Sequence, residues 1–294
     1  MRMLPCKQSM LIRFKPLLCV NFSIRRIHKV AQNSYDSNAA LYNQVRPSYP
    51  RDAVNFIIEQ LPEGKPCKIL DLAAGTGIFT KVLYEELPST ASLVAVEPVA
   101  GMRESFKKSM PSSVSVEAGT STSIPFPDDY FDMVTVAQAF HWFSNIESLR
   151  EINRVLKKDG RGTLALIWNL ESDKEEWVGK LRALYEVYDG DVPQYRKRQW
   201  ESVFIEDTKC FAQPLEKYQY RQEMLVSQEE VWDRVLSKSY ITALSLQEQV
   251  KLREQVQRLV RVDFVDKFCV DRDGVRCAVQ PLDVEVALAR TVKL

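Results

Sequence analysis

Two carboxylates and a glycine-containing turn form the pattern in this sequence that most clearly suggests chemistry. Asp71 lies in a short apolar run, and residues 73–77, Ala-Ala-Gly-Thr-Gly, follow at once. Glu97 comes 20 residues after Gly77, at the end of the next apolar run. A carboxylate at that spacing can accept both hydrogen bonds of a ribose diol, and glycines let a ligand approach the backbone. The pattern indicates a site for a ribose-containing ligand.

The sign of the charge at this turn favours a cationic ligand. Turns that bind dinucleotides carry a third glycine, where this chain has Thr80. A carboxylate at Asp71 would repel a pyrophosphate, whereas it would attract the sulfonium and ammonium groups of S-adenosylmethionine. The sequence therefore favours this methyl donor, and a nicotinamide-dependent dehydrogenase is the weaker interpretation.

Alternating strand and helix patterns surround the turn. Continuous apolar runs are typical of parallel strands covered on both faces, and they predict strands over residues 68–72, 93–97, 114–117, 131–137 and 162–168. Helices are expected over residues 78–87 and 101–110, and after a capping box formed by Ser144 and Glu147, with a stop at Gly160. This alternation predicts an α/β fold with a Rossmann-like, doubly wound, mostly parallel sheet.

From Glu171 onward the pattern becomes helical and rich in aromatic residues. Two further capping boxes begin at Ser227 and Ser245. This region is either a lid over the carboxyl edge of the sheet or a packed helical layer. Near the C-terminus, residues 271–277 are expected to be an irregular exposed segment, and residues 284–289 an edge strand at most.

Charge, cysteines and hydropathy exclude several classes of protein. The 294 residues include 40 basic and 39 acidic side chains, for a net charge of +1, which gives no overall attraction to nucleic acid or to an anionic membrane. The longest charge-free stretch, residues 133–146, is shorter than the roughly 18 residues of a membrane span. Six scattered cysteines and two histidines predict no metal site.

Several motifs together resemble one enzyme family. The segment 69–77, the triplet Val96-Glu-Pro98, the strand 131–137 and the helix 151–160 are similar to the motifs of class I S-adenosylmethionine-dependent methyltransferases. Tyr42-x-x-x-Arg46-Pro-Ser-Tyr-Pro50 and residues 139–143 narrow the resemblance to the small-molecule branch (methyltransferase type 11) that includes trans-aconitate methyltransferase-like proteins. The resemblance covers roughly residues 35–240.

The resemblance implies a set of residues around the cofactor. Those expected to surround its methionine portion and sulfonium are Tyr42, Arg46, Asp71, Gln138 and the backbone of Ala73, Gly75 and Gly77. Those expected near its ribose and adenine are Glu97, Pro98, Met102, Thr120 and Ser121. Each has a simpler alternative: Asp71 as a helix cap, Met102 as core, Arg46 as an exposed charge, and Thr120 and Ser121 as polar loop residues.

The acceptor is expected to be a small molecule, and a carboxylic acid that becomes a methyl ester is favoured. His141 would be a general base if the acceptor were a hydroxyl, but a carboxylate needs no base, so we expect a positioning role. Tyr195–Arg198 and Arg221 are candidate carboxylate clamps, although exposed basic runs are usually solvated. Two alternatives stay open: methylation of a macromolecule, and a binding protein of this fold without turnover.

The N-terminus differs in charge from the remainder of the chain. Residues 1–35 contain seven basic side chains and no acidic one, which resembles a mitochondrial transit segment. We expect a basic tail over residues 1–33 and a methyltransferase domain over 34–294, with the cofactor-binding core at 66–168 and the helical lid and terminal strands at 171–294. A cytoplasmic location is expected, with a mitochondrial one as the alternative.

Overall fold

A central sheet organises the computed structural model, which describes residues 45–206 and 209–293. Eight strands form this sheet in the order β3-β2-β1-β4-β5-β8-β6, with β7 paired to β8. The strands are β1 (Cys67–Leu72), β2 (Ala91–Val96), β3 (Ser115–Glu117), β4 (Met133–Ala137), β5 (Thr163–Glu171), β6 (Glu216–Ser227), β7 (Val270–Arg272) and β8 (Val275–Arg290). The first five strands pair in parallel, and β8 pairs antiparallel with β5, β6 and β7.

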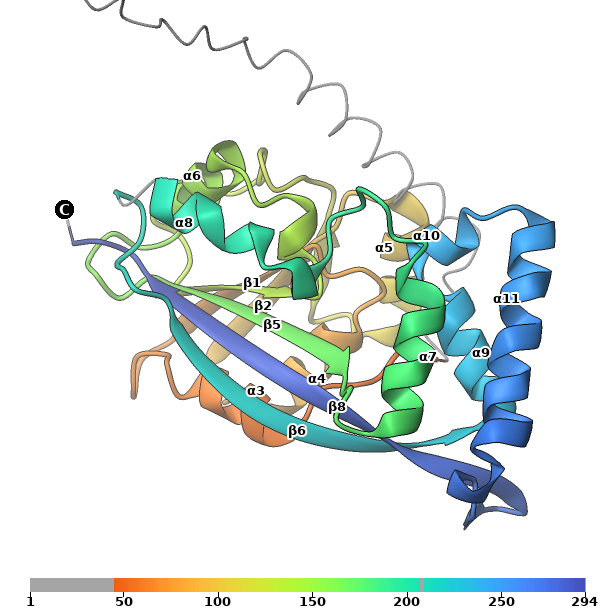
Figure 1. The fold of residues 1–294 in the computed structure, drawn as a ribbon. Coiled ribbons are helices and arrows are strands. Elements are labelled where there is room, and N and C mark those ends of the chain that lie inside the picture. The colour runs from red at the N-terminus through yellow and green to blue at the C-terminus, as the bar shows by residue number, and fades with distance from the viewer. Residues whose placement is uncertain (1–44, 207–208, 294) are drawn as a thin grey trace, which may run out of the picture.

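Helices cover both faces of the sheet (Figure 1). On one face, α3 (Arg51–Ile58), α4 (Ile78–Glu86) and α5 (Ala100–Ser109) bury their apolar sides against the strands. On the other, α6 (Ile146–Val155) and α8 (Ser202–Glu206) do the same. Burial on both faces explains why the parallel strands are continuously apolar, and the predicted Rossmann-like doubly wound sheet is confirmed.

A third apolar cluster lies beside the sheet, on the right in Figure 1. It contains residues of α7 (Glu176–Glu186), α9 (Gln228–Leu236), α10 (Ser239–Thr242) and α11 (Leu246–Arg258). Trp177, Trp232 and Phe268 are buried in it. The helical region after β5 is therefore a packed layer with its own core, and α9 and α10 also reach the pocket described below.

The C-terminal prediction was wrong. Strand β8 is not an edge strand, because it lies inside the sheet between β5 and β6. Residues 271–277 form most of a hairpin, in which Arg272 pairs with Val275 across the Asp273-Gly274 turn. Both turn residues have positive φ, 55° and 81°, as the tight turns that join antiparallel strands require. The Asp-Gly pair is a strong sequence signal for such a hairpin.

The predicted cap of α6 also needs correction. Asn145, rather than Ser144, caps this helix, since its Oδ1 accepts a hydrogen bond from the Ser148 backbone N–H at 2.8 Å. The helix ends at Val155, so residues 157–160 form the turn that follows it and not its last turn. The capping boxes at Ser227 and Ser245 are confirmed, each with both reciprocal hydrogen bonds.

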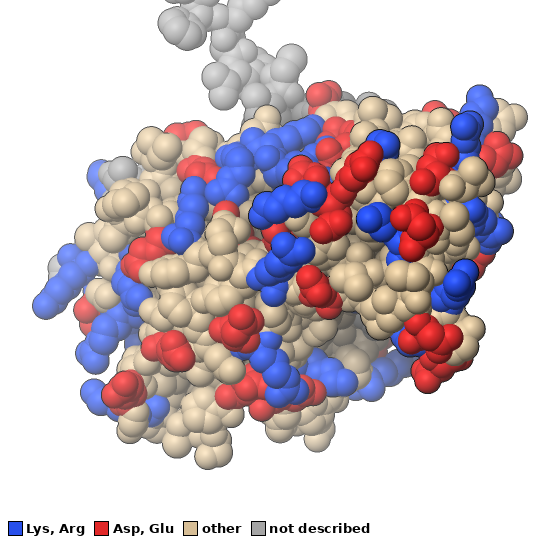
Figure 2. Space-filling model, turned by 60° about the horizontal axis from the view of Figure 1, so that its bottom comes forward, with Lys and Arg blue, Asp and Glu red and all other residues tan. Residues whose placement is uncertain are grey.

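The surface charges and the tests for a membrane span and a metal site do not single out a function. Figure 2 shows basic and acidic side chains interspersed over one face of the molecule. Within residues 45–206 and 209–293, no helix has the length and apolar character to cross a membrane. The same residues contain no cluster of three or more histidine, cysteine or acidic side chains suited to a metal ion. The predicted tail, residues 1–33, and Tyr42 lie outside the described residues.

Candidate functional site

The turn after β1 forms one wall of a pocket at the carboxyl edge of the sheet. Ala73, Gly75 and Gly77 all have positive φ, at 58°, 59° and 92°. The N–H groups of Ala73 and Ala74 both donate to the carbonyl of Val96, at 2.8 and 3.2 Å. A Cβ on Gly77 would lie 2.9 Å from a ring carbon of Phe106. The turn is therefore tight, and only glycine fits at its last position.

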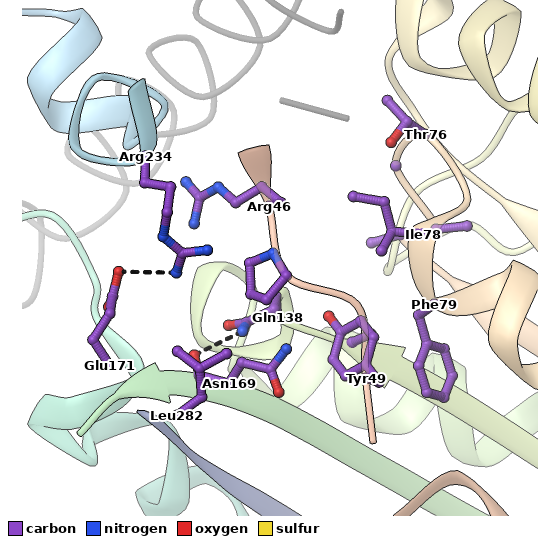
Figure 3. Close-up of a pocket in the computed structure, with 15 residues that line it drawn as sticks. Arg46, Tyr49, Thr76, Ile78, Phe79, Gln138, Asn169, Glu171, Arg234 and Leu282 are labelled. Atoms are coloured by element: carbon purple, nitrogen blue, oxygen red, sulfur yellow. Dashed lines mark hydrogen bonds and ion pairs between the residues drawn. The ribbon is translucent and has the colours of Figure 1, made fainter. Parts of the chain in front are cut away.

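This pocket, which we call the cofactor cavity, encloses about 630 Å³ of space including its opening to solvent. Figure 3 shows Arg46 and Arg234 together above it, and Tyr49 and Phe79 on the other side. Its lining comprises Arg46, Pro47, Tyr49, residues 73–76, Ile78, Phe79, Ala137, Gln138, Asn169, Glu171, Arg234 and Leu282.

Asp71 does not line the cofactor cavity. Its side chain is fully buried behind the turn, where Thr80 Oγ1 donates to Oδ2 at 2.5 Å and Thr135 Oγ1 donates to Oδ1 at 3.1 Å. Burial raises its pKa to about 7, against the opposing effect of these two hydrogen bonds. In this structure Asp71 holds β1, β4 and the start of α4 together, and its role toward a cationic ligand stays a prediction.

Glu97 lies under the same turn. Its Oε2 accepts from the Gly75 N–H at 2.9 Å, and its Oε1 accepts from the Val99 N–H, also at 2.9 Å. Burial raises the pKa of Glu97, while the two backbone hydrogen bonds oppose that rise. The carboxylate therefore fixes the turn in this structure, and ribose binding by Glu97 stays a prediction.

The residues expected near adenine divide into buried and exposed sets. Met102 is buried in α5, whereas Pro98 and Thr120 are exposed. Ser121 accepts a hydrogen bond from Ser148 Oγ at 2.8 Å. None of these four residues lines the cofactor cavity, so their adenine contacts stay predictions.

Gln138 and Arg46 do line the cofactor cavity. Gln138 has a φ of 57°, and its Nε2 donates to the carbonyl of Asn169 at 2.8 Å (Figure 3). Arg46 donates from Nη2 to the carbonyl of Ser237 at 2.8 Å, which joins the segment before α3 to the segment after α9. The N-terminal segment and the helical layer thus meet at the mouth of the pocket.

A buried ion cluster lies beside Arg46. Glu171, the last residue of β5, has its Oε1 2.9 Å from Lys238 Nζ and 3.6 Å from Arg234 Nη2. Burial alone would raise the pKa of Glu171, but these two cations hold it well below its usual range. Burial lowers the pKa of Lys238 to about 8, although Glu171 opposes this shift. Two buried cations therefore share one carboxylate.

A second cavity, here called the acceptor cavity, adjoins the first. Both are lined by Arg46, Gln138, Asn169 and Glu171. Residues that line only the acceptor cavity are His141, Trp142, Leu170, Gln194, Tyr195, Arg196, Lys238, Ser239 and Tyr240. The two cavities thus meet at Gln138 and Asn169.

The structure separates the candidate carboxylate clamps. Tyr195 and Arg196 line the acceptor cavity, but Arg196 is already paired with Glu186 and Asp189. Arg198 pairs with Glu285 at 2.7 Å and does not line the acceptor cavity. Arg221 is on β6, 3.6 Å from Glu223, and does not line either cavity.

Sequence reasoning missed the polar residues at the end of β5 and in the helical layer. Asn169 and Glu171 lie at the carboxyl end of β5, so the rule that ligands bind at the carboxyl ends of parallel strands could have identified them. Arg234 and Lys238 carry no comparable local signal, because only the tertiary packing of α9 brings them to β5.

Ala73 offers a test of the strained turn. A non-glycine residue with φ of 58° costs about 1–2 kcal/mol, whereas glycine loses about 0.5–1 kcal/mol of backbone entropy. We expect Ala73→Gly to raise the free energy of unfolding by about 0.5–1 kcal/mol, measured by urea denaturation. Ala74→Gly, at a neighbouring position without positive φ, is the control and should not stabilise. A loss of stability in Ala73→Gly would contradict the assigned strain.

Comparisons with known proteins agree with this geometry. A family model described as a methyltransferase domain matches residues 70–164. The chain is 30% identical over 227 residues to a protein of Mycobacterium tuberculosis named an uncharacterized methyltransferase, covering 77% of this chain and 85% of that one. A methyltransferase-like protein of Schizosaccharomyces pombe is 33% identical over 171 residues. That match covers 58% of this chain and 65% of the yeast protein.

The fold agrees as well. A solved structure from Anaeromyxobacter dehalogenans, named as a type II methyltransferase, superposes with a TM-score of 0.62 at 16% identity and covers 85% of this chain and 99% of that one. The strand order, the turn after β1 and the similar proteins all indicate one family. This chain belongs to the class I S-adenosylmethionine-dependent methyltransferases.

Proposed function

We propose that this protein transfers a methyl group from S-adenosylmethionine to the carboxylate of a small-molecule acid. The observation that carries the proposal is the surplus of positive charge where the two cavities meet. Arg234 and Lys238 are both buried and share the single carboxylate of Glu171. A buried cation needs a counter-charge, and an anionic acceptor in the adjoining cavity would supply it.

Two buried polar atoms of the cofactor cavity support the proposed cofactor. Within the described residues, Asn169 Oδ1 and Arg234 Nε are buried and have no hydrogen-bond partner. One is an acceptor and the other a donor, and buried groups of this kind are normally paired. An ammonium beside Asn169 and a carboxylate beside Arg234 would satisfy both, and the methionine end of S-adenosylmethionine carries this pair of groups. With its sulfonium the cofactor has one net positive charge, so its binding would leave the surplus of positive charge in place for an anionic acceptor.

The shared wall of the two cavities gives the residues their proposed roles. When bound, S-adenosylmethionine supplies an activated methyl group on its sulfonium. Gln138 and Asn169 would orient cofactor and acceptor at the junction, because they line both cavities. Lys238 and Tyr240 would bind the acceptor from the helical layer. The contribution of the protein is then mainly proximity and alignment, since a carboxylate is already a nucleophile.

A relative also supports a small-molecule acceptor. A protein of Thermotoga maritima named demethylmenaquinone methyltransferase is 31% identical over 150 residues, covering 48% of this chain and 64% of that one. Its name describes methylation of a small molecule rather than of a macromolecule. The proposal that the acceptor is a carboxylate rests on the surplus of positive charge alone.

Calorimetry tests the cofactor. We expect S-adenosylmethionine to bind the full chain with micromolar affinity, and Glu97→Ala to weaken binding by about 1–3 kcal/mol, because the turn loses two hydrogen bonds. Glu104→Ala, at an exposed position on α5, is the control and should bind normally. Absence of binding by folded wild-type protein would overturn the cofactor assignment.

An acceptor screen tests the carboxylate. The full chain is incubated with methyl-labelled cofactor and a panel of small carboxylic acids, each paired with its primary amide. We expect methyl ester formation from at least one acid and none from its amide, because the amide lacks the negative charge. Label that appears on hydroxyl or amine groups while carboxylates stay unmodified would contradict the proposed acceptor class.

A further inference from the structure

Trp168 is held rigidly behind the acceptor cavity. It belongs to β5, has no exposed surface, and packs against two other aromatic rings. Its ring centroid is 4.7 Å from that of Tyr195 and 4.5 Å from that of Trp200, at interplanar angles of 21° and 35°. Contact with both rings restricts the orientation of the indole, so its N–H has a fixed direction.

That N–H is directed at His141. Trp168 Nε1 lies 3.3 Å from His141 Nδ1. An indole nitrogen can only donate, so Nδ1 must be the acceptor. A neutral imidazole has one donor and one acceptor nitrogen, and the proton of His141 is therefore on Nε2.

The surroundings of His141 keep the ring neutral. The charged side chains that line the acceptor cavity with it are Arg46, Arg196, Lys238 and Glu171. Three of these four are cations. Burial of the ring lowers the pKa of His141 to about 3.

We propose that Trp168 is a positioning residue that fixes His141 as a hydrogen-bond donor through Nε2–H, and that this donor orients an acceptor oxygen bearing a free lone pair. This inference rests on the proposed function and narrows its chemistry. A base at Nε2 is excluded in this tautomer, and a base at Nδ1 would have to displace the indole. The acceptor therefore reacts without losing a proton to His141, as a carboxylate does.

Nitrogen NMR of the full chain labelled with ¹⁵N-histidine tests the tautomer without any substrate. The chain has only two histidines, so His28→Asn assigns the His141 signals. We expect the Nε2–H tautomer alone, unchanged between about pH 8 and about pH 5. Trp168→Phe should keep the aromatic packing and yet give a mixture of both tautomers. An Nδ1–H tautomer, or a cationic ring at pH 6, would overturn the inference.

Trp200 supplies a matched control. It lies in the same aromatic stack, but its Nε1 is buried without a hydrogen-bond partner among the described residues. Trp200→Phe should therefore leave the tautomer of His141 unchanged. If Trp168→Phe and Trp200→Phe shift the signals equally, general repacking is responsible and the positioning role is wrong.

Variants of His141 connect the tautomer to turnover of an acid found in the screen. Glutamine places an N–H near the position of Nε2 without acting as a base, so His141→Gln should keep kcat/KM within about tenfold, whereas His141→Phe should lose more than about a hundredfold. Equal, complete loss in both variants would indicate a base and overturn the inference. Failure of cofactor binding or of the acid screen would instead remove the proposed function and leave the NMR result standing.

Discussion

Replacing Glu171 by alanine should lower the free energy of unfolding by about 3–5 kcal/mol. The substitution leaves Lys238 and Arg234 buried without their shared carboxylate, and it also removes the acceptor 3.3 Å from the Tyr185 hydroxyl. The side chains of Glu171, Arg234 and Lys238 are 11%, 7% and 11% exposed, so water cannot replace the lost partner. Urea denaturation at neutral pH measures the change.

An exposed ion pair provides the comparison for this prediction. Lys174 Nζ lies 3.3 Å from Asp283, with the two side chains 70% and 30% exposed. Asp283→Asn should cost less than about 1 kcal/mol, as surface pairs do. A double variant, Glu171→Leu with Lys238→Met, should recover part of the stability lost in Glu171→Ala, because one buried cation is removed with the anion. If the free energy of unfolding of Glu171→Ala lay within about 1 kcal/mol of the wild-type value, water would reach the ion cluster. The surplus of positive charge would then no longer support an anionic acceptor.

The fold around the cofactor cavity was predictable because its signals are local. Continuous apolar runs indicated β1 to β5, and the turn at residues 73–77 followed directly from its glycines. The same kind of signal was present at Asp273-Gly274, where a hairpin joins β7 to β8. It was missed because the surrounding charged residues suggested an irregular segment. Strand β6 was missed because it lacks a continuous apolar run like those that indicated β1 to β5, and the weaker signal of alternating exposed and half-buried positions was overlooked.

The direction in which a side chain points was harder to predict than the element that carries it. Asp71 and Glu97 were expected at the ligand, and in the structure their carboxylates accept hydrogen bonds from Thr80, Thr135, Gly75 and Val99 around the turn. Their contacts with a ligand stay predictions. A residue near the end of a strand can face the ligand or the interior, and the strand pattern alone does not distinguish these.

The acceptor side of the site depends on contacts between distant parts of the chain. Lys238 meets Glu171 across 67 positions, and Arg46 meets Ser237 across 191. No periodicity or capping signal encodes such pairs, because they follow from how the helical layer packs on the sheet. Sequence reasoning therefore indicated the cofactor more fully than the acceptor.

Asp71 should make the stability of this protein fall as the pH rises toward 8. Its folded-state pKa, about 7, lies above the ordinary value of 3.8 for an aspartate, because burial favours the neutral carboxyl. The folded state therefore binds the proton more tightly than the unfolded state. The resulting stabilisation is fully present below the unfolded pKa and is lost as the pH rises through the folded pKa.

Asp71→Asn isolates this contribution, since asparagine keeps the shape of the neutral carboxyl and does not ionise. One pKa unit corresponds to about 1.4 kcal/mol, so the stability of the variant relative to wild type should increase by about 2–3 kcal/mol between about pH 5 and about pH 8.5. Urea denaturation of both proteins at these pH values measures the difference. Asp132→Asn serves as a control, because Asp132 is also a buried carboxylate but has a cationic partner, Lys157, at 2.6 Å. A difference that is independent of pH would show that Asp71 is ionised throughout. In that case the carboxylate behind the turn would carry its full negative charge at neutral pH. It would then attract a cationic cofactor electrostatically, as the sequence predicts.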